Sequence, residues 1–211
     1  MEPLTSTAPW DSVYQARSAP WLIDQPQPEI VALERDGWIR GSVLDVGCGA
    51  GEHTIHLTAR GHTVLGTDFS PAAVDVARAN AAARDVPATF EVVDALALGD
   101  QPCFDTIVDS ALFHIFGEPE RTRYVRSLSR VLRPGGQIFV LALAESDTEP
   151  GFGPRISDTV IREAFGDGWT IEELRPSRYR VLVDADNAAR SGLPEGQLAD
   201  LPAWLARIRR N

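Results

Sequence analysis

Short apolar runs alternate with amphipathic segments along the first two thirds of this chain. The amphipathic segments have helical periodicity and lie near residues 52–60, 71–84 and 119–132. The apolar runs have the length of buried strands and lie near residues 42–47, 62–67, 88–93, 104–109 and 136–143. Strands that alternate with helices are joined by crossovers, so they pair in parallel. The pattern predicts an α/β fold with a doubly wound, mostly parallel sheet.

Two of the predicted helices carry boundary signals. Ser70-Pro71 supplies an N-cap followed by a proline in the first turn, and Pro134-Gly135-Gly136 stops the helix before it. The longest strongly apolar run, Ile138 to Ala144, is far too short to span a bilayer and indicates a buried parallel strand. No membrane partner is expected.

The last quarter of the chain has a different pattern. After residue 157 we expect a short helix, then a final hairpin of Trp169–Leu174 and Tyr179–Val183 around Arg175-Pro176-Ser177. The tail from Asp184 is polar until four apolar residues with helical spacing. These residues are Leu198, Leu201, Leu205 and Ile208. Their spacing predicts one docked amphipathic helix.

Length and composition predict a single domain. The chain has 211 residues, of which 44% are hydrophobic, and that is enough for one full core. Residues 1–40 form a lead-in, residues 41–183 the core and residues 184–211 the tail.

The first strand leads directly into a turn with glycine at alternate positions, Gly47, Gly49 and Gly51. Glycine lets the backbone approach a ligand closely, and the helix that follows presents its free N–H groups at the strand end. This geometry suits a nucleoside cofactor. A dinucleotide-binding turn would place its third glycine one position later, where this chain has Glu52.

Acidic residues mark the strand ends. Asp45 lies two residues before the first glycine, and Asp68, Asp94 and Asp109 end the next three strands. One such residue alone is most simply a loop or cap residue. Several of them in register with a glycine turn indicate a ligand site, because the carboxyl ends of parallel strands face one crevice. Asp68 implies binding of a ribose diol, whereas Asp109 has a structural alternative.

These motifs resemble the class I S-adenosylmethionine-dependent methyltransferases. Phe104–Ser110 is similar to the fourth strand of that family, and Arg130–Val140 to its helix, turn and fifth strand. The resemblance implies a Rossmann-like, seven-stranded sheet with an antiparallel edge strand. It also implies that the glycine turn holds the methionine part of S-adenosylmethionine, that Asp68 binds the ribose hydroxyls and that Asp94 meets the adenine amine. S-adenosylhomocysteine would be the product.

The residues expected at the cofactor are Asp45, Gly47, Cys48, Gly49, Gly51, Asp68, Phe69, Asp94, Ala95, Leu96 and Asp109. By resemblance, Phe69 and Leu96 would sandwich the adenine, although either could equally belong to the core. Cys48 fills a small space beside the ligand, because no basic residue adjoins it to make it a nucleophile.

The segment after the fourth strand indicates the acceptor site. His114 stands where members of the family line the acceptor pocket and is our candidate general base; the alternative is a histidine that only shapes the pocket. Amino-group methyltransferases carry an Asn/Asp-Pro-Pro-aromatic motif here, whereas this chain has Asp109-Ser110-Ala111-Leu112. A nucleobase or protein amide target is therefore disfavoured.

Aromatic residues are concentrated in the lead-in. A lid over the crevice and packing against the sheet edge both explain them. Ala19-Pro20-Trp21, the segment containing His114 and Phe152-Gly153-Pro154-Arg155 resemble thiopurine-methyltransferase-like enzymes, especially the mycobacterial heterocyclic toxin methyltransferases. That resemblance implies detoxifying O-, N- or S-methylation of a small aromatic heterocycle. The expected substrate contacts are Trp10, Tyr14, Trp21, Phe113, His114, Phe152 and Arg155.

Composition narrows the partners. The net charge of −10 repels phosphate backbones, so no nucleic acid partner is expected. All 20 basic residues are arginine, and without lysine neither a pyridoxal Schiff base nor a P-loop lysine is possible. Two cysteines and the absence of an N-terminal signal pattern predict a cytoplasmic protein, as a monomer or homodimer. His53 and His56 lack a third ligand, so no metal is expected.

Three other functions remain open. A biosynthetic C- or O-methyltransferase acting on a quinone or polyketide would share every motif above. An NAD(P)-dependent oxidoreductase is disfavoured by the glycine spacing and by the lack of a Tyr-x-x-x-Lys pair. A non-catalytic protein that binds a nucleoside cofactor would retain the turn and the strand-end acids.

Overall fold

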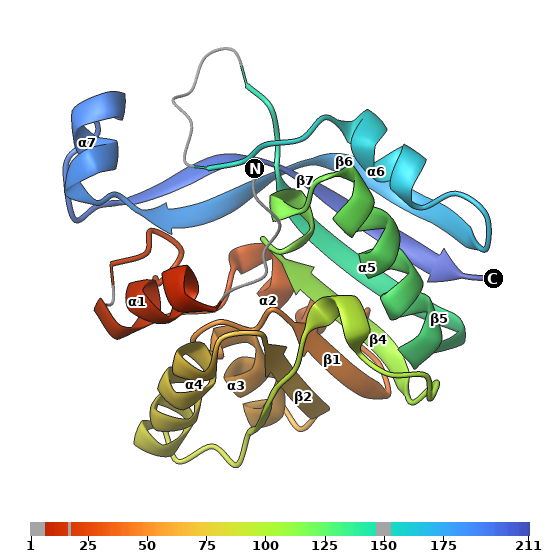
Figure 1. Cartoon of the computed structure of the whole chain (residues 1–211). Coiled ribbons are helices and arrows are strands. Elements are labelled where there is room, and N and C mark those ends of the chain that lie inside the picture. The colour runs from red at the N-terminus through yellow and green to blue at the C-terminus, as the bar shows by residue number, and fades with distance from the viewer. Residues whose placement is uncertain (1–6, 17, 147–152) are drawn as a thin grey trace.

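A seven-stranded mixed sheet forms the centre of the computed structural model, which describes residues 7–16, 18–146 and 153–211. The strand order is β3-β2-β1-β4-β5-β7-β6 (Figure 1). Five strands run parallel: β1 Ser42–Val46, β2 Thr63–Asp68, β3 Thr89–Val92, β4 Phe104–Ser110 and β5 Leu132–Leu143. The other two, β6 Trp169–Leu182 and β7 Leu198–Arg210, are antiparallel to their neighbours. The predicted doubly wound sheet with an antiparallel edge is confirmed.

Helices cover both faces of the sheet. They are α1 Ala8–Ala16, α2 Pro28–Arg35, α3 Glu52–Ala59, α4 Pro71–Ala83, α5 Glu118–Val131, α6 Asp158–Ala164 and α7 Ala185–Ser191. Two short 3-10 helices, η1 Ala95–Ala97 and η2 Phe113–Ile115, follow β3 and β4. α5 and α6 pack on one face, while α2 and α3 pack on the other. None of the helices in these ranges is long and apolar enough to cross a membrane.

β5 shows why the central strands are continuous apolar runs. Ile138, Val140 and Ala142 pack under α5 and α6, while Phe139 and Leu141 pack on the opposite face. Successive side chains of a strand point to opposite faces, so a strand covered on both sides has no polar positions to alternate.

The predicted boundary of α4 is confirmed. Ser70 Oγ accepts a hydrogen bond from the Ala73 N–H at 3.1 Å, and Pro71 occupies the first turn. This cap satisfies one of the free N–H groups at the start of the helix.

The predicted amphipathic helix at the C-terminus is wrong, because residues 198–210 form β7, inserted between β5 and β6. Leu201, Ala203 and Leu205 face one core cluster, and Ala206 and Ile208 face the other. The large apolar residues alone have helical spacing. The two alanines complete the alternation of a strand that is buried on both faces.

The predicted hairpin at residues 169–183 is also wrong, because the whole stretch is one strand, β6. Its real partner is β7, which returns after α7. Pro176 pairs with Trp204 inside the ladder. Since β6 is the edge strand, a proline there interrupts no hydrogen bond to a further strand.

Candidate active site

A cleft opens at the carboxyl ends of the parallel strands. The strand order reverses between β1 and β4, and ligands of open α/β sheets bind at such a switch point. The cleft has a cavity volume of about 220 Å³ and is open to solvent at its mouth. Its lining includes Trp10, Tyr14, Trp21, Gln27, Gly47, Cys48, Gly49, His53, Asp68, Phe69, Asp94, Ala95, Leu96, Ser110, Leu112, His114 and Tyr179.

The glycine turn forms the floor of one end of this cleft. Gly49 has φ 54°, and a Cβ on it would lie 2.8 Å from Tyr14 Oη. Gly51 has φ 85°, and a Cβ there would meet the Phe90 ring at 2.8 Å. Both positions therefore require glycine, Gly49 for the ligand side and Gly51 for packing of α3 and α4.

Asp68 lies at the end of β2 and lines the cleft beside the turn. Its two carboxylate oxygens accept hydrogen bonds from the N–H groups of Gly49 and Ser70, each at 2.9 Å. Burial raises the pKa of Asp68, and the two backbone donors offset part of that rise. The carboxylate is thus held by the turn at the cleft wall.

Asp94 begins η1 and accepts a hydrogen bond from the Leu96 N–H at 2.9 Å. It is solvent-exposed at the cleft edge, with Ala95 and Leu96 next to it and Phe69 in the same lining. A carboxylate at the rim between apolar side chains fits an adenine ring whose amine faces the acid. The structure thus brings together the predicted acids of β2 and β3.

Two other predicted cofactor residues are scaffold residues in this structure. Asp45 is buried behind the cleft, and its Oδ2 accepts from the N–H and Oγ of Thr54 at 3.1 and 2.6 Å. Asp109 accepts from Tyr124 Oη at 2.7 Å and from the N–H of Leu112 at 3.0 Å. Burial raises the pKa of both carboxyls to about 6. Neither lines the cleft, and nor does Gly51.

The N-terminal segment closes one side of the cleft. The rings of Trp10 and Trp21 lie 6.0 Å apart, and Trp21 Nε1 donates to Tyr14 Oη at 3.2 Å. Asp11 fixes α1 to the start of α4, where its carboxylate accepts from Ser70 Oγ and from the Ala72 N–H. A carboxylate at a helix N-terminus is favoured by the helix dipole. The sequence contained no signal that pointed to Asp11.

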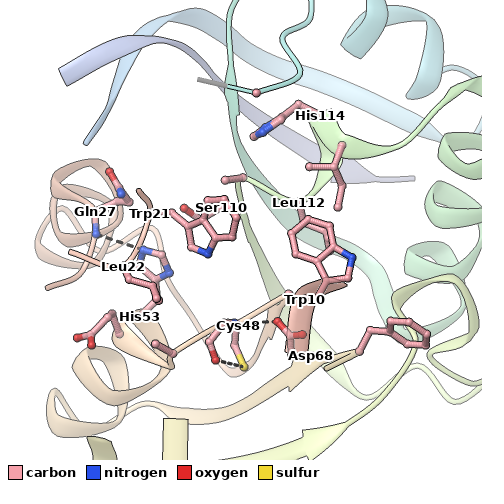
Figure 2. A pocket seen from close by; sticks show the side chains of 18 of the residues that line it. Trp10, Trp21, Leu22, Gln27, Cys48, His53, Asp68, Ser110, Leu112 and His114 are labelled. Carbon is pink, nitrogen blue, oxygen red and sulfur yellow. Dashed lines mark hydrogen bonds between the residues drawn. The ribbon is translucent and has the colours of Figure 1, made fainter. Parts of the chain in front are cut away.

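The acceptor end of the cleft lies beyond the turn. Figure 2 shows His114 across the cavity from Cys48 and Asp68, with Trp10 between them in this view. His114 is 6% exposed, and its Nδ1 accepts a hydrogen bond from the Leu143 N–H at 3.3 Å. Burial lowers the pKa of His114 to about 4. Cys48 is a free cysteine whose thiol donates to the Gly49 carbonyl at 3.9 Å, and burial raises the pKa of the thiol, so it is a poor nucleophile.

Two expected substrate contacts lie outside the cleft lining. Phe113 is fully buried in the core, 5.6 Å from the ring of Phe165, and does not line the cleft. Arg155 donates to the Ala144 carbonyl at 3.3 Å and lies outside the lining, to which Gly153 and Pro154 contribute instead. Phe152 lies outside the described residues.

The sequence did not indicate Gln27, Ser110 or Tyr179 as cleft residues. The Gln27 side chain pairs with the backbone of Arg180 at 2.8 and 2.7 Å and so attaches the lead-in to β6. The backbone N–H of Gln27 also donates to His53 Nε2 at 3.2 Å. The contacts between Gln27 and Arg180 join residues 153 positions apart, and only the true course of β6 reveals them.

Two of the other three histidines lie near one acid. His56 Nε2 and His62 Nε2 lie 3.9 and 3.7 Å from the carboxylate of Glu34. Within residues 7–16, 18–146 and 153–211, no three His, Cys, Asp or Glu side chains are arranged to hold a metal ion.

Known proteins share these features. A family model described as a methyltransferase domain matches residues 43–136. A 2-heptyl-1-hydroxyquinolin-4(1H)-one methyltransferase from Mycobacteroides abscessus is 38% identical over 167 residues, which cover 77% of this chain and 74% of that protein. A demethylmenaquinone methyltransferase from Deinococcus radiodurans is 36% identical over 172 residues, covering 80% of this chain and 65% of that protein.

A solved structure gives the same result for the whole fold. That structure concerns the conversion of a disulfide bond into a thioacetal group during echinomycin biosynthesis. It superposes on this chain with a TM-score of 0.85 at 36% sequence identity. The match covers 97% of this chain and 93% of that chain. The chain therefore belongs to the class I S-adenosylmethionine-dependent methyltransferases, and S-adenosylmethionine is its cofactor.

Proposed function

We propose that this enzyme methylates an oxygen, nitrogen or sulfur atom of a small aromatic heterocycle, of the hydroxyquinolone or thiopurine kind, and that the reaction detoxifies it in the cytoplasm. One observation carries the proposal. The cleft is continuous, with Asp68 and the glycine turn at one end, His114 at the other and the Trp10–Trp21 pair beside the space between them (Figure 2). Aromatic walls suit a planar acceptor.

Each end of the cleft has a separate task in this proposal. Gly47 and Gly49 hold the amino-acid end of the cofactor, Asp68 its ribose and Asp94 its adenine amine, with Phe69 and Leu96 on the faces of the ring. Trp10, Tyr14 and Trp21 cover the acceptor and keep water out. Bound S-adenosylmethionine supplies an activated methyl group, so the protein chiefly has to align the reactants, which contributes up to ~7–11 kcal/mol in favourable cases.

The similarity to the Mycobacteroides abscessus hydroxyquinolone methyltransferase supports the heterocyclic acceptor. A second candidate is a biosynthetic O- or C-methyltransferase that acts on a quinol. The similarity to the Deinococcus radiodurans demethylmenaquinone methyltransferase favours it, although this chain spans 65% of that protein.

Mass spectrometry on a panel of acceptors tests the choice. The full chain is incubated with S-adenosylmethionine and hydroxyquinolones, thiopurines, simple phenols and quinols, and both methylated product and S-adenosylhomocysteine are measured. We expect the highest kcat/KM on a heteroaromatic oxygen, nitrogen or sulfur. Turnover confined to quinols would replace the detoxifying proposal with the biosynthetic one. If no acceptor were methylated although the cofactor still bound, both candidate functions would be contradicted.

A further inference from the structure

The ring of His114 is held in one orientation by the sheet. Its Nδ1 accepts the hydrogen bond of the Leu143 N–H at 3.3 Å, at the end of β5. A ring nitrogen that accepts a hydrogen bond carries no proton, so the proton of the neutral ring is on Nε2. Burial alone lowers the pKa of His114 to about 4, so the ring stays neutral near pH 7.

The Nε2–H group of His114 is available to a ligand. The side chain lines the cleft (Figure 2), and within the described ranges Nε2 forms no hydrogen bond. Other titratable side chains in the lining are Tyr14, Asp24, Cys48, Glu52, His53, Asp68, Asp94 and Tyr179. None of them contributes to the pKa shift of His114. The group facing the acceptor is thus a neutral donor.

Two hydroxyl groups extend this donor surface. Ser110, the last residue of β4, has its Oγ buried without a partner at normal hydrogen-bond distance in the described part of the chain. Tyr179 of β6 is buried, and burial raises the pKa of its phenol, so it keeps its proton. The Ser110 and Gln27 side chains lie close enough to Tyr179 to offset part of that rise. Both hydroxyls line the same cleft as His114.

These observations do not suit a general base. Nε2 already carries a proton, and Nδ1 is turned to the backbone. A base with a pKa of about 4 would also have to remove a proton from a phenol with a pKa of about 10, uphill by about six pKa units. The same ring is well suited to donate a hydrogen bond to an anion, since such bonds are about twice as strong as neutral ones.

We propose, on the basis of the proposed function, that His114 binds the acceptor through Nε2–H, and that the acceptor is an acidic aromatic hydroxyl or thiol that is already ionised. Ser110 and Tyr179 donate to the polar edge of the same ring system. The acceptor proton passes to solvent before the reaction. A lone pair of the acceptor's oxygen or sulfur then forms a bond to the methyl carbon while the carbon–sulfur bond of the sulfonium breaks, and the electron pair of that bond remains on the cofactor sulfur as a neutral thioether.

The tautomer of His114 can be measured without any acceptor. Nitrogen-15 NMR of the histidine side chains of the full chain separates the two neutral tautomers, and loss of one signal set in His114→Gln assigns it. We expect the Nε2–H tautomer and no titration between pH 5.5 and 8.5. An Nδ1–H tautomer, or a titration midpoint near pH 6.5, would overturn the inference while leaving the proposed function intact.

The pH dependence of turnover is the second test. It uses two acceptors of similar shape whose own pKa values lie below 6 and above 9, with cofactor at saturation. We expect kcat/KM to rise with the ionisation of each acceptor, so that the two midpoints differ. One shared midpoint that disappears in His114→Gln would identify an enzyme base instead and would sink the inference.

Two substitutions separate hydrogen-bond donation from proton removal. His114→Gln keeps an N–H donor, whereas His114→Leu keeps a side chain of similar size that has no hydrogen-bond donor. We expect His114→Leu to lose about 10- to 100-fold in kcat/KM on the acidic acceptor, the range for one hydrogen bond to a charge, and His114→Gln to recover part of that loss. Equal losses in both variants would contradict donation. Calorimetry with S-adenosylmethionine should give wild-type affinity in both variants. If the wild-type enzyme turned over no acceptor, that result would count against the proposed function alone.

Discussion

The two ends of the cleft are built in different ways. The cofactor end uses residues that directly follow β1, β2 and β3, and each is close in sequence to the strand that positions it. The acceptor end combines the N-terminal segment, the residues after β4, Gly153 and Pro154, and Tyr179 of the edge strand. The first end is a local consequence of the sheet, while the second depends on the long-range packing of the whole chain.

The chemistry of the two ends differs as well. At the cofactor end, a carboxylate and a close approach of backbone fit a ligand with hydroxyl and amino donors. At the acceptor end, neutral donors and aromatic rings fit a flat ligand with one polar edge. The cofactor is shared across the family, and the end that binds it is defined by short motifs. The acceptor varies between enzymes, and the end that binds it can change in sequence without altering those motifs.

Substitution of Asp68 should have the largest effect, at the cofactor end alone. Asp68→Ala removes the ribose partner and also frees the Gly49 N–H that the carboxylate now holds at 2.9 Å. We expect affinity for S-adenosylmethionine to fall at least about 100-fold in calorimetry, since each hydrogen bond to a charge is worth ~1.5–3 kcal/mol. Asp75→Ala, on the exposed face of α4, serves as the control. Affinity near that of the wild type would remove Asp68 from the cofactor site.

Trp21 provides the matching test at the acceptor end. Trp21→Ala removes one half of the Trp10–Trp21 pair and the donor to Tyr14. We expect the KM for the acceptor to rise about tenfold, as for truncation of a buried aromatic contact, with unchanged cofactor affinity. Trp38→Ala is the matched control, because that ring stacks with Arg207 away from the cleft lining. An equal rise in both variants would show a general effect on folding.

The buried carboxylates beneath the two ends permit a more precise comparison. Thr54→Val removes a hydroxyl donor to Asp45 under the glycine turn, and Tyr124→Phe removes one from Asp109 under the residues leading to His114. Each variant removes one hydrogen bond from a buried carboxylate, so we expect a loss of about 1–3 kcal/mol in the free energy of unfolding. Thr54→Val should weaken cofactor binding, whereas Tyr124→Phe should raise the acceptor KM. The two ends would prove coupled if each variant changed both constants equally.

The same division explains what could be predicted from the sequence. The parallel strands were predicted correctly, and Gly47, Gly49, Asp68 and Asp94 line the cleft, because each is specified by a few neighbouring residues. Sequence spacing could not show that Asp45 and Asp109 turn away from the cleft, because that depends on Thr54 and Tyr124 as buried partners.

The errors at the C-terminus had a further consequence. With Leu198–Arg210 taken for a helix and Trp169–Val183 for a hairpin, Tyr179 had no reason to lie near the cleft. In the structure β7 pairs with β5, and β6 pairs with β7, so Tyr179 lines the cleft with Ser110. Two small residues of β7, Ala203 and Ala206, separated the correct pattern from the helical one.

Asp11 should give the smallest effect, and it tests whether the N-terminal wall is held in place by the cofactor end. Its carboxylate accepts from Ser70 Oγ and from the Ala72 N–H, so one contact joins α1 to the cap of the helix that follows Asp68. Since Asp11 is only partly buried, we expect Asp11→Ala to raise the acceptor KM by about two- to fivefold, the range of a solvent-screened contact. Cofactor affinity in calorimetry should stay unchanged. If it fell together with acceptor binding, the wall would belong to both ends, and their separation into a local and a long-range half would no longer hold.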